Sequence, residues 1–551
     1  MLWLTEKNMT KVAQYLQEHL VGEVMTSADA REYFATDGSV LKVIPQIIAY
    51  PRTEQDVRKA ARFSWQLAER GRVVPITARG GGTDQGGGAI GSGIMMVFPA
   101  HMNKILTLNT KKRSVTVQPG INYGKLQQAL HTHGLFLPPF PASQEYCTVG
   151  GAIANNASGE KTIKYGSTRE FVSSLRVVLA NGEVIETGRL TKRELNRKMG
   201  LATFEGEIYR TLDALITENK DLINSSYFDV TKNSAGYDLG IIKGKKGTFD
   251  LTPLFVGSQG TLGIITEAVI DLENFNPSTT LVAAQFDSIA SAGAAILDLR
   301  KLAPSSMEVV DDKLLEFIDE HNPSQLGKSI QRPFSKIILL VEFDNLSNRV
   351  QRKKTRKAKK ILAKLATDVV VTRDEHEQED LWKIRHSAAA VLWQTIGTKK
   401  ALPIIEDGVV PPEKFTEFIE QSYKLFESFG LQIAVWGHAG NANLHMQPFL
   451  DLGQIGDRQK VLKVMDAYYK MVIELGGSTS GEHNDGRLRA PYLEDLYGPQ
   501  MYELFKNVKQ IFDPYNTLNP GVKFGTSKQD LQGLLRHEFS LKHLFDHMPR
   551  S

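Results

Sequence analysis

Between Gln46 and Leu272 short apolar runs alternate with segments whose apolar residues recur every three to four positions. Val57–Gly71 has this helical spacing. The runs that are typical of β-strands are Val73–Ile76, Ser114–Gln118, Leu175–Leu179 and Gly263–Glu267. The alternation predicts an α+β domain in the first half of the chain.

From Thr280 onward, apolar runs again alternate with helical stretches. The runs that predict strands are Leu281–Phe286, Lys336–Phe343 and Gln432–Trp436. The chain therefore divides at about residue 275. We expect a helical lead-in over residues 1–35, a first domain over 36–275, a second over 276–500, a C-terminal segment over 501–525 that is turn-rich at Asp513–Gly521, and a polar tail over 526–551 without an interpretable motif.

The composition is that of a soluble globular chain. Of the 551 residues 41% are hydrophobic, and the net charge of +4 gives no indication of a nucleic-acid partner. We find no signal-peptide core and no window of ~18 apolar residues, so we expect a cytoplasmic protein without a transmembrane segment. The basic run Lys353–Lys360 is typical of the solvated face of an amphipathic helix, and peripheral contact with the inner membrane face is the alternative.

Cys147 is the only cysteine. This excludes a disulfide and an iron–sulfur cluster held within this chain, because a cluster needs about four cysteine ligands. We interpret the role of Cys147 as packing.

The segment Arg79–Gly93 contains eight glycines in fifteen residues and follows the strand-like run Arg72–Ile76. Glycine lets the backbone approach a ligand closely, and successive N–H groups of such a loop form an anion-binding nest. The expected ligand is a phosphate or pyrophosphate, and a mobile glycine linker is the alternative. A second small-residue cluster, Pro141–Gly159, favours the binding loop.

Neither common nucleotide motif fits this loop. A P-loop requires Lys-Ser or Lys-Thr at its end, and none follows Gly80–Gly93. Gly86–Gly91 matches the dinucleotide fingerprint only because nearly every residue there is glycine, and no helical period follows. We therefore expect neither a P-loop nor a Rossmann fold.

Two later segments concentrate metal-ligating side chains. A Gly/Asn-rich turn separates His438 from His445, and a hairpin there would bring the two rings together. A second glycine-rich turn adds Glu482 and His483. Two imidazoles and one carboxylate with an open position suit zinc or a similar divalent ion. The alternative is that each histidine is structural.

Seven segments rich in glycine and small polar residues occur in order along the chain: Arg79-Gly-Gly-Gly-Thr83, Pro141-Ala-Ser143, Thr148-Val-Gly-Gly151, Asn155-Asn-Ala-Ser-Gly159, Lys164-Tyr-Gly166, Gly257–Ile265 and Asn519-Pro-Gly521. Together they resemble the FAD-binding domain of the vanillyl-alcohol-oxidase/PCMH superfamily. Within it the chain is similar to the FAD-linked D-2-hydroxyacid dehydrogenases (D-lactate, glycolate and D-2-hydroxyglutarate dehydrogenases). The resemblance extends from about Thr36 to Gly521, most of the chain.

The resemblance implies an α+β fold in which a PCMH-type domain of two subdomains holds FAD between them, under a ferredoxin-like α/β cap. Asp513–Gly521 would return to the flavin domain. No histidine occurs in either phosphate-binding cluster, so we expect non-covalent FAD. The residues that the resemblance assigns to FAD are Arg79, Gly80, Gly81, Gly82, Thr83, Pro141, Ala142, Ser143, Thr148, Gly150, Gly151, Asn155, Asn156, Ser158, Gly159, Tyr165, Gly166, Gly260, Ile264 and Asn519.

The resemblance also implies roles for residues in the two later segments that concentrate metal-ligating side chains. His438, His445 and Glu482 match metal-binding positions, His483 matches the general base, and Asn443 matches a substrate-side asparagine.

Arg385 matches the arginine that clamps the substrate carboxylate, a task suited to the planar guanidinium fork, and a surface arginine is the alternative. Glu406 and Asp407 resemble a recurring acidic pair whose role stays open.

The implied reaction oxidises a D-2-hydroxyacid to the 2-oxoacid, with hydride passing from C2 to flavin N5. The metal would act as a Lewis acid on the C2 hydroxyl, and His483 would accept its proton. Lactate, glycolate, 2-hydroxyglutarate and larger hydroxyacids share the reacting head group. The electron acceptor stays open between a quinone, another flavoprotein, a separate iron–sulfur protein and O₂.

Three residues depart from the usual motifs. Asn441 and Ala442 replace Asp and Gly in the metal loop, and Asn484 replaces a glycine beside the presumed base, but no ligand is lost. Arg487–Leu493 resembles the continuation in large bacterial members that carry a C-terminal iron–sulfur module. The alternatives are a non-redox flavoenzyme of the same fold, such as the ether-lipid synthase, and a silent flavin-binding subunit of a multi-subunit oxidase. The intact His and Glu motifs argue against both alternatives.

Overall fold

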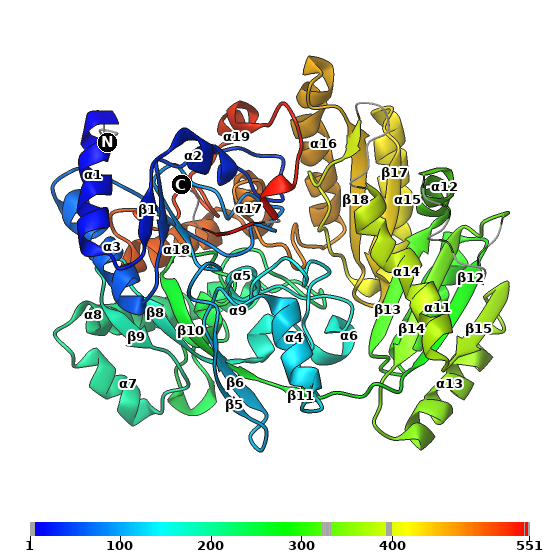
Figure 1. The fold of residues 1–551 in the computed structure, drawn as a ribbon. Coiled ribbons are helices and arrows are strands. Elements are labelled where there is room, and N and C mark those ends of the chain that lie inside the picture. The colour runs from blue at the N-terminus through cyan, green and yellow to red at the C-terminus, as the bar shows by residue number, and fades with distance from the viewer. Residues whose placement is uncertain are drawn as a thin grey trace.

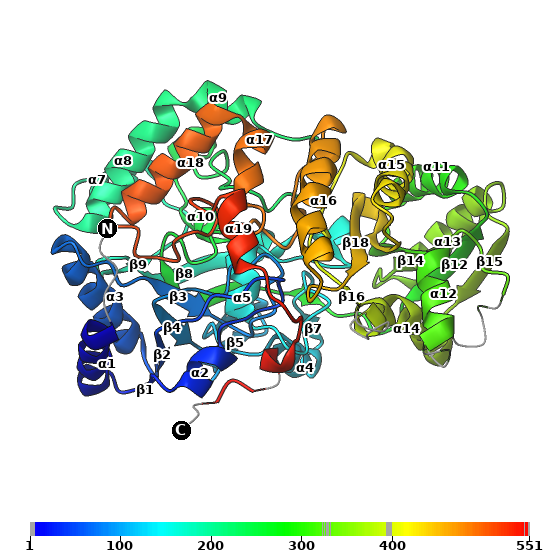
Figure 2. The ribbon, with the colours of Figure 1, turned by 90° about the horizontal axis from the view of Figure 1, so that it is seen from above.

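The computed structural model describes residues 6–548 apart from 322, 324–325, 327–329, 331, 393–398 and 545. Two α/β bodies lie side by side (Figure 1). The first comprises the elements from α1 (Glu6–His19) to β11 (Glu273–Asn274), and the second those from β12 (Thr280–Phe286) to α16 (Ile455–Glu474). The C-terminal part of the chain then returns to the first body (Figure 2).

The described residues of the first body form two main sheets. One is four-stranded in the order β1-β2-β4-β3, and the other is five-stranded and antiparallel in the order β5-β6-β10-β8-β9. A short pair, β11-β7, adjoins them. The strands are β1 (Glu23–Met25), β2 (Ile47–Tyr50), β3 (Ile76–Arg79), β4 (Ile94–Val97), β5 (Ile105–Asn109), β6 (Ser114–Val117), β7 (Leu135–Phe136), β8 (Val172–Val178), β9 (Val184–Glu186) and β10 (Ile264–Asp271).

The helices of the first body cover these sheets and contribute to separate hydrophobic cores for the two subdomains. They are α2 (Ala28–Tyr33), α3 (Glu54–Glu69), α4 (Tyr123–His131), α5 (Val149–Asn155), α6 (Thr162–Tyr165), α7 (Lys192–Met199), α8 (Phe204–Glu218), α9 (Lys220–Ser225) and α10 (Thr252–Phe255).

The start of β3 differs from the sequence prediction. The apolar run predicts a strand from Val73, whereas β3 begins at Ile76. Pro75 has no N–H, so it cannot donate to a ladder; its carbonyl accepts the N–H of Ile94 instead. The glycine loop therefore leaves the sheet three residues later than the pattern indicates, at Arg79.

The second body is built on a seven-stranded antiparallel sheet in the order β15-β12-β14-β13-β17-β18-β16, as far as its described residues extend. Along β14, Ile337, Leu339 and Val341 pack in one core, whereas Ile338 and Leu340 pack in another. The sheet is thus buried on both faces, because successive side chains of a strand point to opposite sides.

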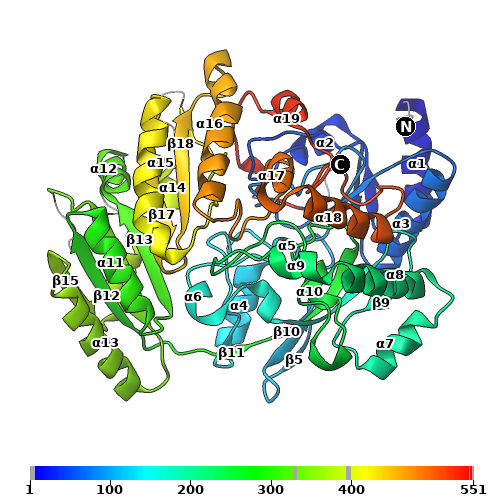
Figure 3. The same cartoon turned by 180° about the vertical axis from the view of Figure 1, so that it is seen from behind.

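The remaining elements of the second body are β13 (Ser306–Asp311), β14 (Ile337–Phe343), β15 (Asp368–Thr372), β16 (Lys400–Ala401), β17 (Ile433–His438), β18 (Asn443–Leu450), α11 (Ile289–Arg300), α12 (Asp312–His321), α13 (Asn348–Leu362), α14 (Glu375–Leu392) and α15 (Phe415–Ser428). Figure 3 shows α11 and α13 beside β12 and β15, at the end of the sheet away from the first body. Among the described residues no helix combines the length and apolarity needed to cross a membrane.

The returning chain forms α17 (Leu493–Tyr497), α18 (Pro499–Phe512) and α19 (Lys528–Leu534). The carbonyl of Thr517 accepts the N–H of Ile76, which ties this segment to the first residue of β3. Further on, His543 lies with Nε2 2.9 Å from the carbonyl oxygen of Gly82. The glycine loop is therefore held by residues more than 400 positions away.

Candidate active site

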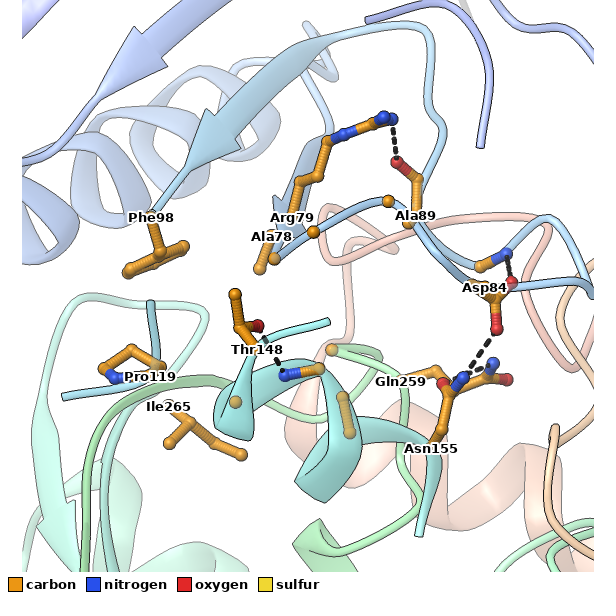
Figure 4. A pocket seen from close by; sticks show the side chains of 18 of the residues that line it. Ala78, Arg79, Asp84, Ala89, Phe98, Pro119, Thr148, Asn155, Gln259 and Ile265 are labelled. Carbon is orange, nitrogen blue, oxygen red and sulfur yellow. Dashed lines mark hydrogen bonds between the residues drawn. The ribbon is translucent and has the colours of Figure 1, made fainter. Parts of the chain in front are cut away.

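The glycine loop after β3 lines a groove in the first body (Figure 4). Its other walls come from the residues at the start of α5 and before β10. The lining residues are Ala78, Arg79, Gly80, Gly81, Gly82, Thr83, Asp84, Gly88, Ala89, Phe98, Pro119, Thr148, Gly150, Gly151, Ala154, Asn155, Gln259, Gly260, Gly263 and Ile265.

The loop presents backbone donors to this groove. No oxygen of the described residues accepts the N–H groups of Gly80, Gly81, Gly82 or Thr83. A Cβ at position 80 would lie 2.2 Å from Oγ1 of Thr148, so only glycine allows this approach. Unpaired donors in a groove of this kind are the nest that a phosphate oxygen satisfies.

Asp84 fixes the second half of the loop. Its carboxylate accepts the N–H groups of Gly86 and Gly88 at 3.0 and 2.5 Å and the side-chain amide of Asn155 at 2.6 Å (Figure 4). Burial raises the pKa of Asp84 above its ordinary value. The sequence analysis missed this residue, although a carboxylate inside a glycine run is a visible signal.

Two predicted FAD residues shape the loop with their side chains. The buried guanidinium of Arg79 turns to the carbonyls of Ala89 and Thr36, at 3.1 and 2.8 Å. Burial lowers its pKa to about 10. Asn519 donates to the carbonyls of Gly88 and Gln259, both at 2.8 Å, and so joins the loop to the segment before β10.

The predicted FAD residues divide between the groove and its surroundings. Those that line it are Arg79, Gly80, Gly81, Gly82, Thr83, Thr148, Gly150, Gly151, Asn155 and Gly260. Those outside its lining are Pro141, Ala142, Ser143, Asn156, Ser158, Gly159, Tyr165, Gly166, Ile264 and Asn519. Among the latter, the hydroxyl of Tyr165 donates to Asp344 of the second body.

Three donor atoms of the predicted metal site, from His438, His445 and Glu482, lie close together. His438 ends β17 and His445 lies on the neighbouring β18, whose pairing sets the two rings 5.3 Å apart. Oε1 of Glu482 lies 3.1 Å from Nε2 of His438 and 3.3 Å from Nε2 of His445. For ligands about 2.1 Å from a tetrahedral zinc ion, the donors are about 3.4 Å apart. The observed spacing therefore fits a divalent ion.

The outer ring nitrogens of both histidines have protein partners. Nδ1 of His438 lies 2.8 Å from Oε1 of Glu308, and Nδ1 of His445 lies 2.8 Å from the carbonyl of Glu406. A proton on each Nδ1 leaves the two Nε2 lone pairs facing Glu482, which is the arrangement that metal-binding histidines adopt.

The other oxygen of Glu482 is held by the first body. Lys232 donates to Oε2 at 2.6 Å and Ser158 donates at 2.8 Å, and both are buried. Burial would raise the pKa of Glu482, but His438 and Lys232 outweigh it and hold that pKa well below its ordinary value. The sequence analysis placed Ser158 with FAD and missed Lys232, which stands in a polar segment without a motif.

His483 lies beside this cluster. Its Nδ1 is 2.5 Å from Oε2 of Glu406, and its Nε2 is 3.6 Å from Oε1 of Glu482. Burial opposes the charged ring, but the carboxylates of Glu406 and Asp407 outweigh it, so the pKa of His483 is raised.

The acidic pair whose role the sequence left open supports the loop that carries these residues. Asp407 accepts the backbone N–H groups of Glu482 and His483, and Glu406 also pairs with buried Arg489. These contacts fix the backbone at both residues.

The two predicted substrate residues are buried. Nε of Arg385 donates to Oε2 of Glu308 at 2.7 Å, so this carboxylate contacts both Arg385 and His438. The amide of Asn443 donates to Asp407, while its Oδ1 has no partner among the described residues. The sequence analysis missed Glu308, although an acidic residue inside an apolar strand is a signal for a buried partner.

A wide cavity separates α14 from the first body next to Arg385. Its lining includes Glu160, Trp382 and His386, and Oε2 of Glu160 lies 3.1 Å from Nε2 of His386 across it. The cavity therefore lies against the part of α14 that carries Trp382 and His386, whereas Arg385 is outside its lining.

Both bodies of the structure match known protein families. Residues 45–188 match an FAD binding domain, and residues 276–522 match the C-terminal domain of FAD linked oxidases. A glycolate oxidase subunit GlcD of Bacillus subtilis is 32% identical over 486 residues, which cover 87% of this chain and 89% of that protein. A D-lactate dehydrogenase of Archaeoglobus fulgidus is 28% identical over 503 residues, covering 91% and 96%.

A D-2-hydroxyglutarate dehydrogenase of Escherichia coli is 31% identical over 519 residues, covering 92% of this chain. The present chain spans 50% of that relative's length.

Solved structures confirm the fold class. A 4-ethylphenol oxidase from Gulosibacter chungangensis superposes with a TM-score of 0.67 at 16% identity, covering 96% of this chain and 99% of that one. A p-cresol methylhydroxylase gives 0.66 at 16% identity, covering 94% and 97%. The fold is thus a PCMH-type FAD-binding domain with an α/β cap, that of an FAD-linked oxidase. Within this class the chain belongs to the FAD-linked D-2-hydroxyacid dehydrogenase family.

Proposed function

We propose that this protein oxidises a D-2-hydroxyacid of the D-lactate, glycolate or D-2-hydroxyglutarate type to the 2-oxoacid, using non-covalent FAD. The observation that carries the proposal is the convergence of His438 and His445 on Oε1 of Glu482, with His483 alongside. Two imidazoles and a carboxylate can hold a divalent ion that binds the hydroxyl oxygen of a hydroxyacid. The adjacent histidine can then act as the base.

FAD would occupy the glycine groove, and when bound it supplies the acceptor for the hydride from C2. The unpaired N–H groups of Gly80 to Thr83 would hold its pyrophosphate.

A divalent ion, zinc by its donor set, would be held by His438, His445 and Glu482 and would supply Lewis acidity toward the substrate hydroxyl. Lys232 and Ser158 hold the other oxygen of Glu482, so Oε1 stays directed at the two rings.

His483 would take the proton of the substrate hydroxyl. The carboxylate of Glu406 beside Nδ1 keeps a proton on that nitrogen, so Nε2 is the free acceptor. The pKa of His483 is raised by Glu406 and Asp407, and a more basic ring is a stronger proton acceptor.

Arg385 would bind the substrate carboxylate. Glu308 engages only Nε, so the terminal nitrogens of the guanidinium have no acceptor among the described residues. The unpaired Oδ1 of Asn443 is a further acceptor for a donor of the substrate. We propose the cavity beside α14 as the route of entry.

The reduced flavin must pass its electrons to an acceptor. The choice stays open between a quinone, another flavoprotein, a separate iron–sulfur protein and O₂. One relative is named as a subunit of a glycolate oxidase, which favours a protein partner as the acceptor.

The test is anaerobic bleaching of the flavin absorbance by D- and L-2-hydroxyacids, with and without a chelator. We expect bleaching by one or more D-acids, loss of bleaching after metal removal, and recovery on adding zinc. A flavin that no hydroxyacid bleaches would contradict the proposed reaction and favour a non-redox or silent flavoprotein. Bleaching that a chelator leaves unchanged would contradict the metal role alone.

A further inference from the structure

Helix α13 carries a row of exposed cations, which we call the cationic stripe: Arg349, Arg352, Lys353, Arg356, Lys357 and Lys360. Their spacing of three and one residues places them on one helical face that extends over about 16 Å. The opposite face, with Thr355 and Leu362, is buried in the second body. Figures 1 and 3 show α13 at the outer edge of that body, on the side away from α5, whose first residues line the glycine groove.

No carboxylate balances the cationic stripe. Helix α13 contains no Asp or Glu, and none of the six cations forms an ion pair with any residue that the structure describes. Like charges three or four positions apart repel each other and destabilise a helix. The stripe keeps this repulsion although the whole chain has a net charge of only +4, so the positive charge is concentrated locally.

Apolar side chains adjoin one end of the stripe. Leu346, just before α13, is 66% exposed, and Val350 in its first turn is 39% exposed. Val350 lies one helical turn from Lys353. Cations beside exposed aliphatic groups match the surface of an anionic bilayer, where phosphates meet the cations and aliphatic groups enter the acyl boundary.

We propose that the cationic stripe docks this protein on a bilayer that contains anionic phospholipid, with α13 lying along the surface. An acidic protein partner would satisfy the six cations but would leave Leu346 and Val350 unexplained. The docking is independent of the proposed reaction, because no stripe residue lies in the flavin groove or the His/Glu cluster.

The test is co-sedimentation of the FAD-loaded protein with vesicles of phosphatidylcholine alone or mixed with phosphatidylglycerol. We expect binding only to the mixed vesicles, with a steep loss as salt rises, since exposed charges are screened. The variant R352Q/K353Q/R356Q should bind about 100-fold more weakly, from about a fivefold factor for each cation near the surface. The matched control K424Q/K463Q/K470Q removes three exposed charges elsewhere on the second body and should bind normally.

A second variant separates a bilayer from an acidic protein. Leu346→Ser should weaken binding to mixed vesicles while leaving binding to soluble polyglutamate unchanged. Equal binding to both vesicle types, no binding to either, or equal loss in the two triple variants would overturn the proposal. Binding of polyglutamate without binding of vesicles would assign the stripe to an acidic protein instead. Anaerobic flavin reduction should be normal in every variant.

Discussion

Glu308 connects two functional side chains through its two oxygens. Oε1 lies 2.8 Å from Nδ1 of His438 and Oε2 accepts from Arg385 at 2.7 Å. The carboxylate is buried, and His438 and Arg385 overcome the effect of burial to lower its pKa. It therefore stays charged and couples the orientation of a proposed metal ligand to that of the proposed substrate arginine.

His483→Gln should lower the rate of flavin reduction by about 10²–10⁴-fold, because it removes the proposed proton acceptor while keeping a side chain of similar size. FAD content and metal content should remain those of the wild type. Stopped-flow reduction with saturating D-acid measures the rate.

The matched control is His376→Gln, since His376 is exposed and is not a member of the cluster. A His483→Gln protein that reduces its flavin at the wild-type rate would rule out the base.

The sequence predicted part of this site because motifs carry local information. His438 and His445 face each other through a hairpin that a Gly/Asn turn announces, and the structure confirms that hairpin as β17 and β18. Lys232 reaches Glu482 across 250 residues, and no local pattern encodes such a contact. Buried charged partners of this kind are visible only once the chain is folded.

At the scale of elements, the glycine loop depends on the close approach of its backbone at Gly80 to Thr148, just before α5. Gly80→Ala should weaken FAD binding by about tenfold or more, because the new Cβ would meet Thr148 and overpacking costs about 1–3 kcal/mol. Flavin released on dilution, measured by fluorescence, reports this affinity.

Gly430→Ala is the control. Gly430 has a positive φ of 65°, and a Cβ there meets nothing within 4 Å. That variant should lose some stability and keep its flavin. Equal flavin loss in both variants would show a general folding defect rather than a loop effect.

Asp311 ends β13 and directly precedes α12, where it accepts the N–H of Leu314 at 2.8 Å and the hydroxyl of Tyr423. Burial raises its pKa to about 7 from an ordinary value of 3.8. Because the folded pKa is the higher one, its stabilising contribution is complete below pH of about 4 and is lost as the pH rises through about 7. The wild type should lose stability between about pH 5 and pH 8 relative to Asp311→Asn.

The difference should be at most a few kcal/mol over this range. Denaturation midpoints of both proteins at the two pH values measure it. Parallel pH dependences would mean that Asp311 titrates as it does in the unfolded chain.

The positions of several strands followed from the apolar pattern, whereas β4, β13 and β15 were not predicted. The predicted runs Leu281–Phe286 and Lys336–Phe343 are confirmed as β12 and β14. The predicted strand from Val73 begins too early, because Pro75 has no N–H to donate to a neighbouring strand. The return of His543 to the glycine loop has no sequence signal, since a single histidine in a polar segment encodes no partner.

At the scale of the whole molecule, the proposed metal site joins ligands from the second body to supports from the first. Metal removal should therefore lower the melting temperature by a few degrees, since a ligand at about 1,000 times its Kd stabilises the native state by about 4 kcal/mol. Differential scanning fluorimetry with chelator, then with added zinc, measures the loss and its recovery.

His445→Gln should melt at the chelated temperature with or without chelator. A melting temperature that chelation leaves unchanged in the wild type would argue against a resident ion.

The contact of Lys232 and Ser158 with Glu482 also limits how such enzymes can be recombined. The cap of this chain, grafted onto the flavin domain of a relative, would keep His438, His445 and Glu482. It would still need a lysine and a serine from its new host to orient that carboxylate. Chimeras should therefore work best when Lys232 and Ser158 are transferred together with the cap. The crossover points should be chosen by the contacts of Glu482 rather than by the boundary between the two sheets.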